Sequence, residues 1–348
     1  MGVTPPKTKN TLLIDAIEGR QTRRTPVWAM RQAGRWDPEF LKLRGDLDFY
    51  SFSDDAHLAA AASLCPRRFG VDAIILFYDI TTLAASMGQK FRLEPNHGPR
   101  PERPIRSLAD VEALAETPEE STFRPVLETL RLVRRELDDE LPVLVFAGAP
   151  FTLGAYQIGV GKKVDEVRAF AAAQPQVWRA LMDRTAAATV GFLRSLLEAG
   201  ATAYQLFDSW AGSLNDEEYP GWAEAHHQRI FSEVGGNSII FVKDAPDVDR
   251  LAKSGAKVLS LSKHHDLADV KRRHPHLCIQ GNVDHELLVT GSPKDVTAAT
   301  VRCLDAGAGS RHILNLDHGM ERTATVDNFK AFVDAARNWK PPQSESRL

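Results

Sequence analysis

Eight short hydrophobic runs recur along the chain, separated by longer segments in which Ala, Leu, Glu and Arg recur at helical spacing. A short, continuous apolar run is typical of a strand that is covered on both faces. Helical segments include Val164–Ala173 and Val177–Ala201, and Val326–Trp339 follows the last run. The predicted strands are Pro26–Met30, Ala73–Phe77, Val143–Ala147, Ala203–Phe207, Ser238–Val242, Val258–Leu261, Cys278–Gln280 and His312–Asn315.

Strand followed by helix, repeated eight times, predicts an α/β chain folded as a single (β/α)8 TIM barrel. A doubly wound sheet is the alternative, but it needs no eighth strand and usually begins with a Gly-rich turn. The chain contains no G-x-G-x-x-G and no Walker motif. We expect one domain over residues 1–348, with an ordered core of about 11–340 and a short N-terminal extension that carries one short helix.

Two segments are expected to lie outside the regular elements. The Pro-rich stretch Asn96–Ile105 predicts a surface loop. The polar tail after Trp339 is typical of disorder.

Polar and small residues follow nearly every predicted strand, at the end where a barrel builds its active site. Because several strands contribute, we expect these residues to meet on one face. They are Arg31–Arg35, Asp79, Gly148–Tyr156, Asp208–Gly212, Lys243–Asp244, Gly281–Asp284 and Asp317–Gly319.

The first of these segments is cationic. Arg31 and Arg35 are four residues apart, and a third arginine follows at Arg44. Two guanidinium groups close together repel unless they bind anions, and arginine binds carboxylates with two parallel hydrogen bonds. The alternative is a solvated pair that is offset by Asp37 and Glu39.

Asp79 follows an apolar run that is typical of a buried strand. Burial of an unpaired carboxylate costs free energy, so we expect Asp79 to be a catalytic residue in a pocket and not a core residue. The alternative is that Asp79 caps a helix that starts near Thr81. The other candidates also have alternatives in which they play a structural role. Tyr156 would be a core aromatic, Ser209 and Asp208 would be turn or cap residues, and His318 would be an ordinary loop histidine.

Net charge and cysteine content limit the classes of partner and the compartment that we expect for this protein. A net charge of −3 gives no sign of nucleic acid or of a membrane surface as a bulk partner, and no apolar stretch reaches the length of a membrane span. The three cysteines are far apart and have no zinc spacing, which fits free thiols in a reducing compartment, and we expect a cytoplasmic protein.

The segments after the strands resemble the uroporphyrinogen decarboxylase family. The resemblance rests first on Pro26-Val-Trp-Ala-Met-Arg-Gln-Ala-Gly-Arg35 and on Phe146-Ala-Gly-Ala-Pro-Phe-Thr-Leu153 with Tyr156. Further matches are Phe77–Ile80, Gln205–Gly212, Gln280–Asp284 and Asn315–Gly319, so it spans residues 11 to 338 or so.

The resemblance implies a (β/α)8 barrel, a homodimer and an enzyme that uses no cofactor or metal. The implied reaction converts the four acetate side chains of uroporphyrinogen III to methyl groups, giving coproporphyrinogen III and CO2. The implied catalytic residues are Asp79, Arg31 and Tyr156, with Asp79 facing the pyrrole nitrogens and Arg31 also a candidate proton donor. The implied substrate-binding residues are Arg31, Gln32, Arg35, Arg44, Asp79, Tyr156, Ser209 and His318.

Some positions depart from the family pattern. Asp317 stands where the family usually has Gly, and it adds a negative charge beside a site for an acidic substrate. The remaining departures are Ser262 and Lys263 for an Asp-Trp pair, His285 for Pro, Tyr78 for a small hydroxyl residue and Trp36 for Tyr.

Two other functions fit parts of the pattern. A corrinoid-dependent methyltransferase of the same superfamily needs thiolate and imidazole zinc ligands late in the chain, where Cys278 and Cys303 stand without a His-x-Cys pair. A tetrapyrrole-binding protein without turnover is the second alternative, and the departures at Asp317, Ser262 and Lys263 keep it open.

Overall fold

The computed structural model describes residues 6–94, 98–245 and 247–340. From residue 341 onward, the tail that was predicted to be disordered lies outside the described residues. The N-terminal extension carries the expected short helix, α1 (Leu12–Glu18), which ends at Gly19 in the left-handed conformation.

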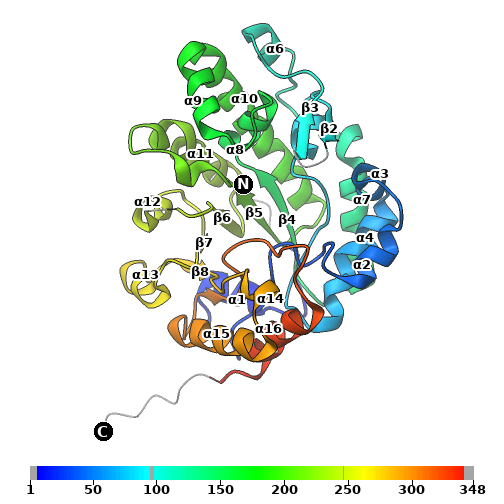
Figure 1. Cartoon of the computed structure of the whole chain (residues 1–348), viewed down its shortest axis with the longest axis vertical. Helices are drawn as coiled ribbons and strands as arrows, with labels where there is room; N and C mark the ends of the chain where they lie inside the picture. Colours follow the sequence, from blue (N-terminus) through cyan, green and yellow to red (C-terminus); the bar gives the residue numbers. More distant parts are fainter. Residues whose placement is uncertain (1–5, 95–97, 246, 341–348) are drawn as a thin grey trace.

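Seven parallel strands form the main sheet, and each pairs with the next one along the chain in the order β1-β4-β5-β6-β7-β8-β9. Because all of the pairs are parallel, the carboxyl ends of the strands lie at the same edge. Figure 1 shows the strands near the middle of the molecule with helices arranged around them. The strands are β1 (Ile74–Ile75), β4 (Val143–Gly148), β5 (Ala203–Phe207), β6 (Ser238–Phe241), β7 (Val258–Ser260), β8 (Cys278–Gln280) and β9 (His312–Ile313).

Helices connect successive strands, as the alternating pattern predicts. The predicted helices Val164–Ala173, Val177–Ala201 and Val326–Trp339 are confirmed as α9, α10 and α16, with ends that differ by a few residues at most. After α1, the α-helices are α2 (Pro38–Arg44), α3 (Phe49–Ser53), α4 (Ala56–Leu64), α5 (Thr82–Ser86), α6 (Leu108–Glu112), α7 (Glu120–Leu137), α8 (Pro150–Gln157), α9 (Val164–Ala173), α10 (Pro175–Glu198), α11 (Ala225–Val234), α12 (Val248–Ala252), α13 (Leu267–Arg273), α14 (Leu287–Thr290), α15 (Pro293–Ala306) and α16 (Val326–Asn338). Shorter turns of helix are η1 (Cys65–Phe69), η2 (Ala211–Ser213) and the π-helix η3 (Pro220–Glu224).

The sheet separates two hydrophobic cores. The inner core contains alternate residues of the strands, such as Ile75, Leu144 and Ile239, and α1 adds Leu13 and Ile17 to it. The larger core lies between the sheet and the surrounding helices. Burial on both faces explains why the strands read as continuous apolar runs and not as alternating patterns.

The segment Pro26–Met30 was expected to be the first strand, and here the prediction was wrong in detail. It forms a single parallel bridge, Val27 to Leu314, and no continuous ladder. Its backbone still bonds to both neighbours: Leu314 N–H donates to the Pro26 carbonyl at 2.9 Å, and Asp72 N–H donates to the Val27 carbonyl at 2.7 Å. Proline at residue 26 has no N–H to extend the ladder, which limits the pairing.

Buried side chains fix this segment inside the sheet. Trp28 Nε1 donates to Gln280 Oε1 at 3.1 Å, and Gln280 in turn donates to Gln205 at 2.9 Å and to Ser260 at 3.0 Å. The polar groups of this layer therefore satisfy one another, as buried polar groups must.

The predicted loop Asn96–Ile105 was wrong for Gly98–Pro101, whereas the described residues 102–105 are irregular as expected. A two-stranded antiparallel ribbon forms there from β2 (Phe91–Glu94) and β3 (Gly98–Pro101). Pro99 and Pro101 alternate with Arg100 along β3, and an edge strand tolerates prolines whose nitrogens face away from its partner. Residues 96 and 97 lie outside the described residues.

None of the helices in the described ranges is long and apolar enough to cross a membrane.

Candidate active site

Arg31 lies where the first segment leaves the sheet. Its backbone adopts the left-handed region with φ of 60°, directly after Met30, whose N–H donates to Asn315 Oδ1 at 3.0 Å. The Arg31 side chain lies across Gly319, where an added Cβ would come within 2.6 Å of the Arg31 Cδ. Trp36 Nε1 donates to the Arg31 carbonyl at 3.3 Å, so this departure from the family pattern supports the loop. Gly319 is therefore required for the Arg31 side chain to lie where it does.

Asp79 follows β1 and is 8% exposed. Its Oδ1 accepts hydrogen bonds from the Thr81 N–H and hydroxyl, both at 2.6 Å. Within the described residues no cation pairs with this carboxylate, and burial raises its pKa above the ordinary value. The capping alternative is correct in part, because Asp79 stabilises the turn before α5; the carboxylate nevertheless remains without a countercharge.

Tyr156 and Tyr50 lie close to Asp79. Burial, followed by the Asp79 carboxylate, raises the pKa of Tyr156 to about 12, while Arg31 and Arg100 act in the opposite direction. The pKa of Tyr50 rises to about 12 for the same two leading reasons, burial and then Asp79. The Tyr156 ring packs against Trp210 with 4.7 Å between the ring centroids. Both phenols therefore stay protonated near neutral pH and can donate hydrogen bonds.

His318 lies on the same face, after β9. Burial lowers its pKa to about 4, and the positive charges of Arg31, His285 and Lys243 act in the same direction. Its ring lies 5.1 Å from the His285 ring and 5.8 Å from Phe241. His318 is therefore a neutral imidazole near pH 7.

Asp317, the departure that places a negative charge beside this site, is paired. Its Oδ1 accepts from the His285 N–H and Nδ1, both at 2.8 Å. The hydrogen bond between the two side chains is the leading reason why the pKa of His285 is raised. The same bond lowers the pKa of Asp317, although burial acts in the opposite direction. Lys263 lies nearby and bridges Asp284 at 3.0 Å and Glu286 at 3.2 Å. Three of the departures, Lys263, His285 and Asp317, are therefore neighbours that balance one another.

The other predicted site residues are less tightly connected. The exposed Arg35 side chain, like that of Arg31, makes no hydrogen bond or ion pair within the described residues. Gln32 is fully buried, accepting from Ala29 N–H and donating to the Ala73 carbonyl at 2.9 Å, so its amide is already occupied. Arg44 donates to the Leu47 carbonyl at 3.1 Å, and Ser209 is half-buried next to Trp210. Direct substrate contacts by these four residues, like those of the other predicted site residues, stay predictions.

Asp208 provides a contrast, since it follows β5 as Asp79 follows β1. Its Oδ2 lies 2.8 Å from His227 Nε2, and both side chains are fully buried. Its Oδ1 accepts from the Thr152 hydroxyl at 2.7 Å and from the Thr152 N–H at 3.2 Å. Asp208 therefore joins β5, α8 and α11, and its charge is used inside the protein.

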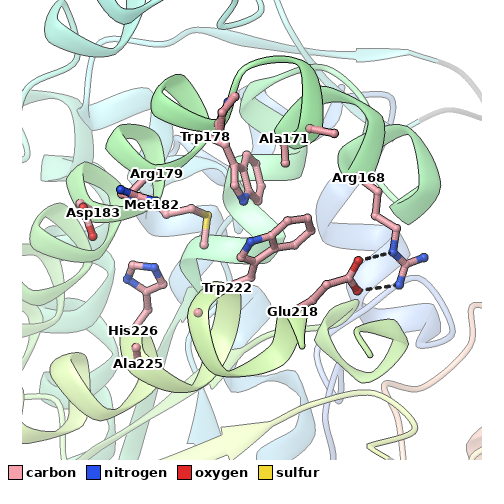
Figure 2. Close-up of a pocket in the computed structure, with 13 residues that line it drawn as sticks. Arg168, Ala171, Trp178, Arg179, Met182, Asp183, Glu218, Trp222, Ala225 and His226 are labelled. Carbon is pink, nitrogen blue, oxygen red and sulfur yellow. Dashed lines mark hydrogen bonds and ion pairs between the residues drawn. The ribbon is translucent and has the colours of Figure 1, made fainter. Parts of the chain in front are cut away.

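A surface groove of about 670 Å³ lies elsewhere, between α9, α10, η3 and α11. Figure 2 shows Trp178, Trp222 and Met182 in it, with the Arg168–Glu218 ion pair at one end. None of the predicted site residues lines this groove. It is therefore distinct from the face on which Arg31, Asp79, Tyr156 and His318 gather.

Sequence reasoning missed two residues of this face. Tyr50 lies in the first turn of the short helix α3 and Arg100 lies on β3, so neither follows a strand of the main sheet. Arg100 lowers the pKa of Tyr156, and Tyr156 in turn raises the pKa of Tyr50. No spacing rule could place them there, because the chain returns to this face from the outer segments.

The parallel sheet and its site define a class: an α/β enzyme of the TIM-barrel-like type, with its polar residues at the carboxyl ends of the strands. The family model described as Uroporphyrinogen decarboxylase (URO-D) matches residues 8–339. The chain is 35% identical to "Uroporphyrinogen decarboxylase" of Alkalilimnicola ehrlichii in an alignment of 353 residues. The alignment covers 97% of this chain and 96% of that one. It is 37% identical to the protein of the same name from Geotalea uraniireducens over 334 residues, with 93% and 97% covered. The chain belongs to the uroporphyrinogen decarboxylase family.

Among solved structures, the chain is similar to a methyltransferase from Methanosarcina mazei, with a TM-score of 0.81. The identity is 20%, and the match covers 95% of this chain and 99% of that one. A likeness at this identity supports the fold and carries no activity with it.

Proposed function

We propose that this chain is the enzyme that decarboxylates the four acetate side chains of uroporphyrinogen III, giving coproporphyrinogen III and CO2 in tetrapyrrole biosynthesis. Family membership over nearly the whole chain supports decarboxylation. The observation that carries the site assignment is a complementary pair. Among the residues that the structure describes, buried Asp79 has no cation paired with it, and Arg31 and Arg35 have no carboxylate paired with them. A ligand with carboxylates at its rim and N–H groups at its centre supplies both partners.

Each step exchanges a carboxylate for a proton: the bond between the acetate methylene and the carboxyl carbon breaks, CO2 leaves, and a proton is added to give a methyl group. The electron pair needs a sink, and a pyrrole protonated on carbon is an electron-poor cation that serves as one without a cofactor. When the methyl group has formed, the ring carbon releases that proton and the neutral pyrrole returns. Asp79 would stabilise this cation and its N–H groups. Two unit charges about 4 Å apart interact by ~4 kcal/mol at an effective dielectric constant of 20, which is worth about 10³ in rate.

Arg31 and Arg35 would bind and orient substrate carboxylates, with Arg31 also a candidate proton donor. Tyr156 would donate a hydrogen bond beside Asp79, and Ser209, His318 and Arg44 would bind further carboxylates. For Gln32, whose amide holds the backbone of Ala29 and Ala73, the support is for an effect exerted through the position of the Arg31 loop.

We also propose a complete (β/α)8 barrel in which Pro26–Met30 serves as the first strand, within one domain over residues 1–348. The hydrogen bonds of this segment to Leu314 and Asp72 support this proposal. A homodimer and a cytoplasmic location belong to the same proposal: the family resemblance supports the first and the free cysteines support the second.

An anaerobic assay tests the function directly. The purified chain is supplied with reduced uroporphyrinogen III, and the products are oxidised and separated by the number of carboxyl groups. Coproporphyrin is the expected product. If the macrocycle binds and no carboxyl group is lost, the chain is a tetrapyrrole-binding protein. Transfer of a methyl group from a corrinoid, supplied in a separate assay, would instead identify a methyltransferase.

A further inference from the structure

We propose that His285, His318 and Glu321 form a binding site for a divalent transition-metal ion such as Zn²⁺ at the edge of the candidate active site. One nitrogen of each imidazole and one carboxylate oxygen of Glu321 lie within 4.8 Å of one another. Two imidazoles and one carboxylate are a common protein ligand set for zinc, with a fourth position left open.

The geometry needs only a small closure. Ligand atoms at about 2.0–2.1 Å from a tetrahedral zinc ion are roughly 3.4 Å from one another. Glu321 is exposed, so its side chain is free to supply most of the movement. His318 offers a nitrogen that needs a partner, because its Nδ1 is buried and makes no hydrogen bond within the described residues.

Asp317 orients the first histidine. Because the Asp317 carboxylate accepts the hydrogen bond of His285 Nδ1 at 2.8 Å, Nε2 of the same ring is left available for a metal ion. A carboxylate behind a metal-binding histidine fixes the ring and makes it a stronger ligand, and its loss typically costs 10–100-fold in metal affinity. The Asp317–His285 pair has this arrangement.

The local charge also favours a cation at His285. The acidic side chains that act on this ring are Asp317, Asp284 and Glu286. Lys263 is held by Asp284 and Glu286 and so neutralises only part of their charge. On the other side, Arg31 and Lys243 approach His318 and disfavour a cation there. Glu321 adds a further negative charge beside the two imidazoles.

Binding of the ion would remove His318 from the residues that are available to a substrate carboxylate. Zn²⁺ is therefore expected to inhibit turnover in competition with substrate, and this consequence rests on the proposed function. Binding of the ion itself does not.

The test uses the full-length chain, freed of metal with a chelator and titrated with Zn²⁺ in a calorimeter. We expect one site per chain, binding about tenfold weaker in Glu321→Gln, 10–100-fold weaker in Asp317→Asn, and not detectable in His285→Gln. His57→Gln is the matched control because His57 is an exposed histidine on α4, and Cys65→Ser excludes the one cysteine that is not buried. Circular dichroism establishes that each variant is folded.

Zn²⁺ affinity that is the same in folded His285→Gln, Glu321→Gln and the parent chain would overturn the site. Zn²⁺ that binds at the site but leaves the Michaelis constant unchanged would overturn the competition. If the parent chain yields no coproporphyrin, the proposed function fails, and the calorimetric result still decides the metal site.

Discussion

Asp79 and Asp208 occupy the same kind of position in two parts of the sheet, and the difference between them separates a candidate catalytic residue from a structural one. Each carboxylate directly follows a hydrophobic run and is buried. Asp208 bonds to His227 and Thr152, both of which lie in neighbouring helices. Within the described part of the chain, Asp79 bonds only to Thr81, two residues further along the chain.

Burying a carboxylate is costly unless its charge is compensated. Asp208 is compensated within the folded chain, so its removal should be felt in stability. The charge of Asp79 is not compensated in this way, so the buried carboxylate destabilises the folded chain as long as no ligand is bound. Destabilised groups of this kind are typical of sites where function outweighs stability.

The largest effect is expected for Asp79→Asn. The amide keeps the shape and still accepts from Thr81, but it cannot balance a cation, so turnover should fall about 10³-fold. Coproporphyrin formation under anaerobic conditions measures it. Near-normal turnover of the reduced macrocycle by this variant would contradict the role of Asp79.

The same substitution sharpens the comparison through its pH dependence. Because burial raises the pKa of Asp79 in the folded chain, ionisation above the ordinary value of 3.8 disfavours the folded state. Asp79→Asn should therefore increase the free energy of unfolding at neutral pH, and the gain should disappear as the pH falls towards 3.8. Denaturant unfolding at both pH values measures the difference; a variant less stable than the parent at neutral pH would contradict this account.

For Asp208, the expected loss is in stability. His227→Ala leaves the buried carboxylate with Thr152 alone, and loss of a hydrogen bond to a charged group costs about 1.5–3 kcal/mol. His227→Gln keeps a donor and serves as the control, with a smaller loss. The free energy of unfolding in denaturant measures both. Equal stability of His227→Ala and the parent chain would show that Asp208 is not held as proposed.

Exposed arginines should affect binding more than folding. Arg35→Ala removes a charged hydrogen-bonding group worth about 1.5–3 kcal/mol, so the Michaelis constant should rise roughly tenfold to a hundredfold and become less sensitive to salt. Arg131→Ala, on the outer helix α7, is the matched control. A Michaelis constant that does not change at any ionic strength would remove Arg35 from the site.

The smallest effect is expected for Tyr156→Phe. The ring still packs against Trp210, so the fold is kept, and the loss of one hydroxyl donor costs about 1 kcal/mol, or roughly fivefold in turnover. Because the pKa of Tyr156 is about 12, its loss should leave the pH profile between 6 and 9 or so unchanged. A changed profile in that range would show that the phenol exchanges a proton during turnover.

The sequence by itself determined the seven strands of the main sheet, the long helices α9, α10 and α16, and the edge of the sheet that the polar residues follow. Continuous apolar runs specify strands that are buried on both sides, and parallel strands bring their carboxyl ends to one edge. The pairing of Pro26–Met30 and Pro99–Pro101 was harder to predict from the sequence. Whether a proline fits in a strand depends on which neighbour its missing N–H would have faced.

Only the tertiary structure decided what each polar side chain does. Asp79 and Asp208 are alike in the sequence, and their difference lies in His227, Thr152 and the helices that carry them. Likewise, Asp317 reads as an excess charge until His285, distant in sequence, is seen beside it. The free energy of a charged group depends on its burial and on its partners within a few ångströms, and both are set by contacts between distant parts of the chain.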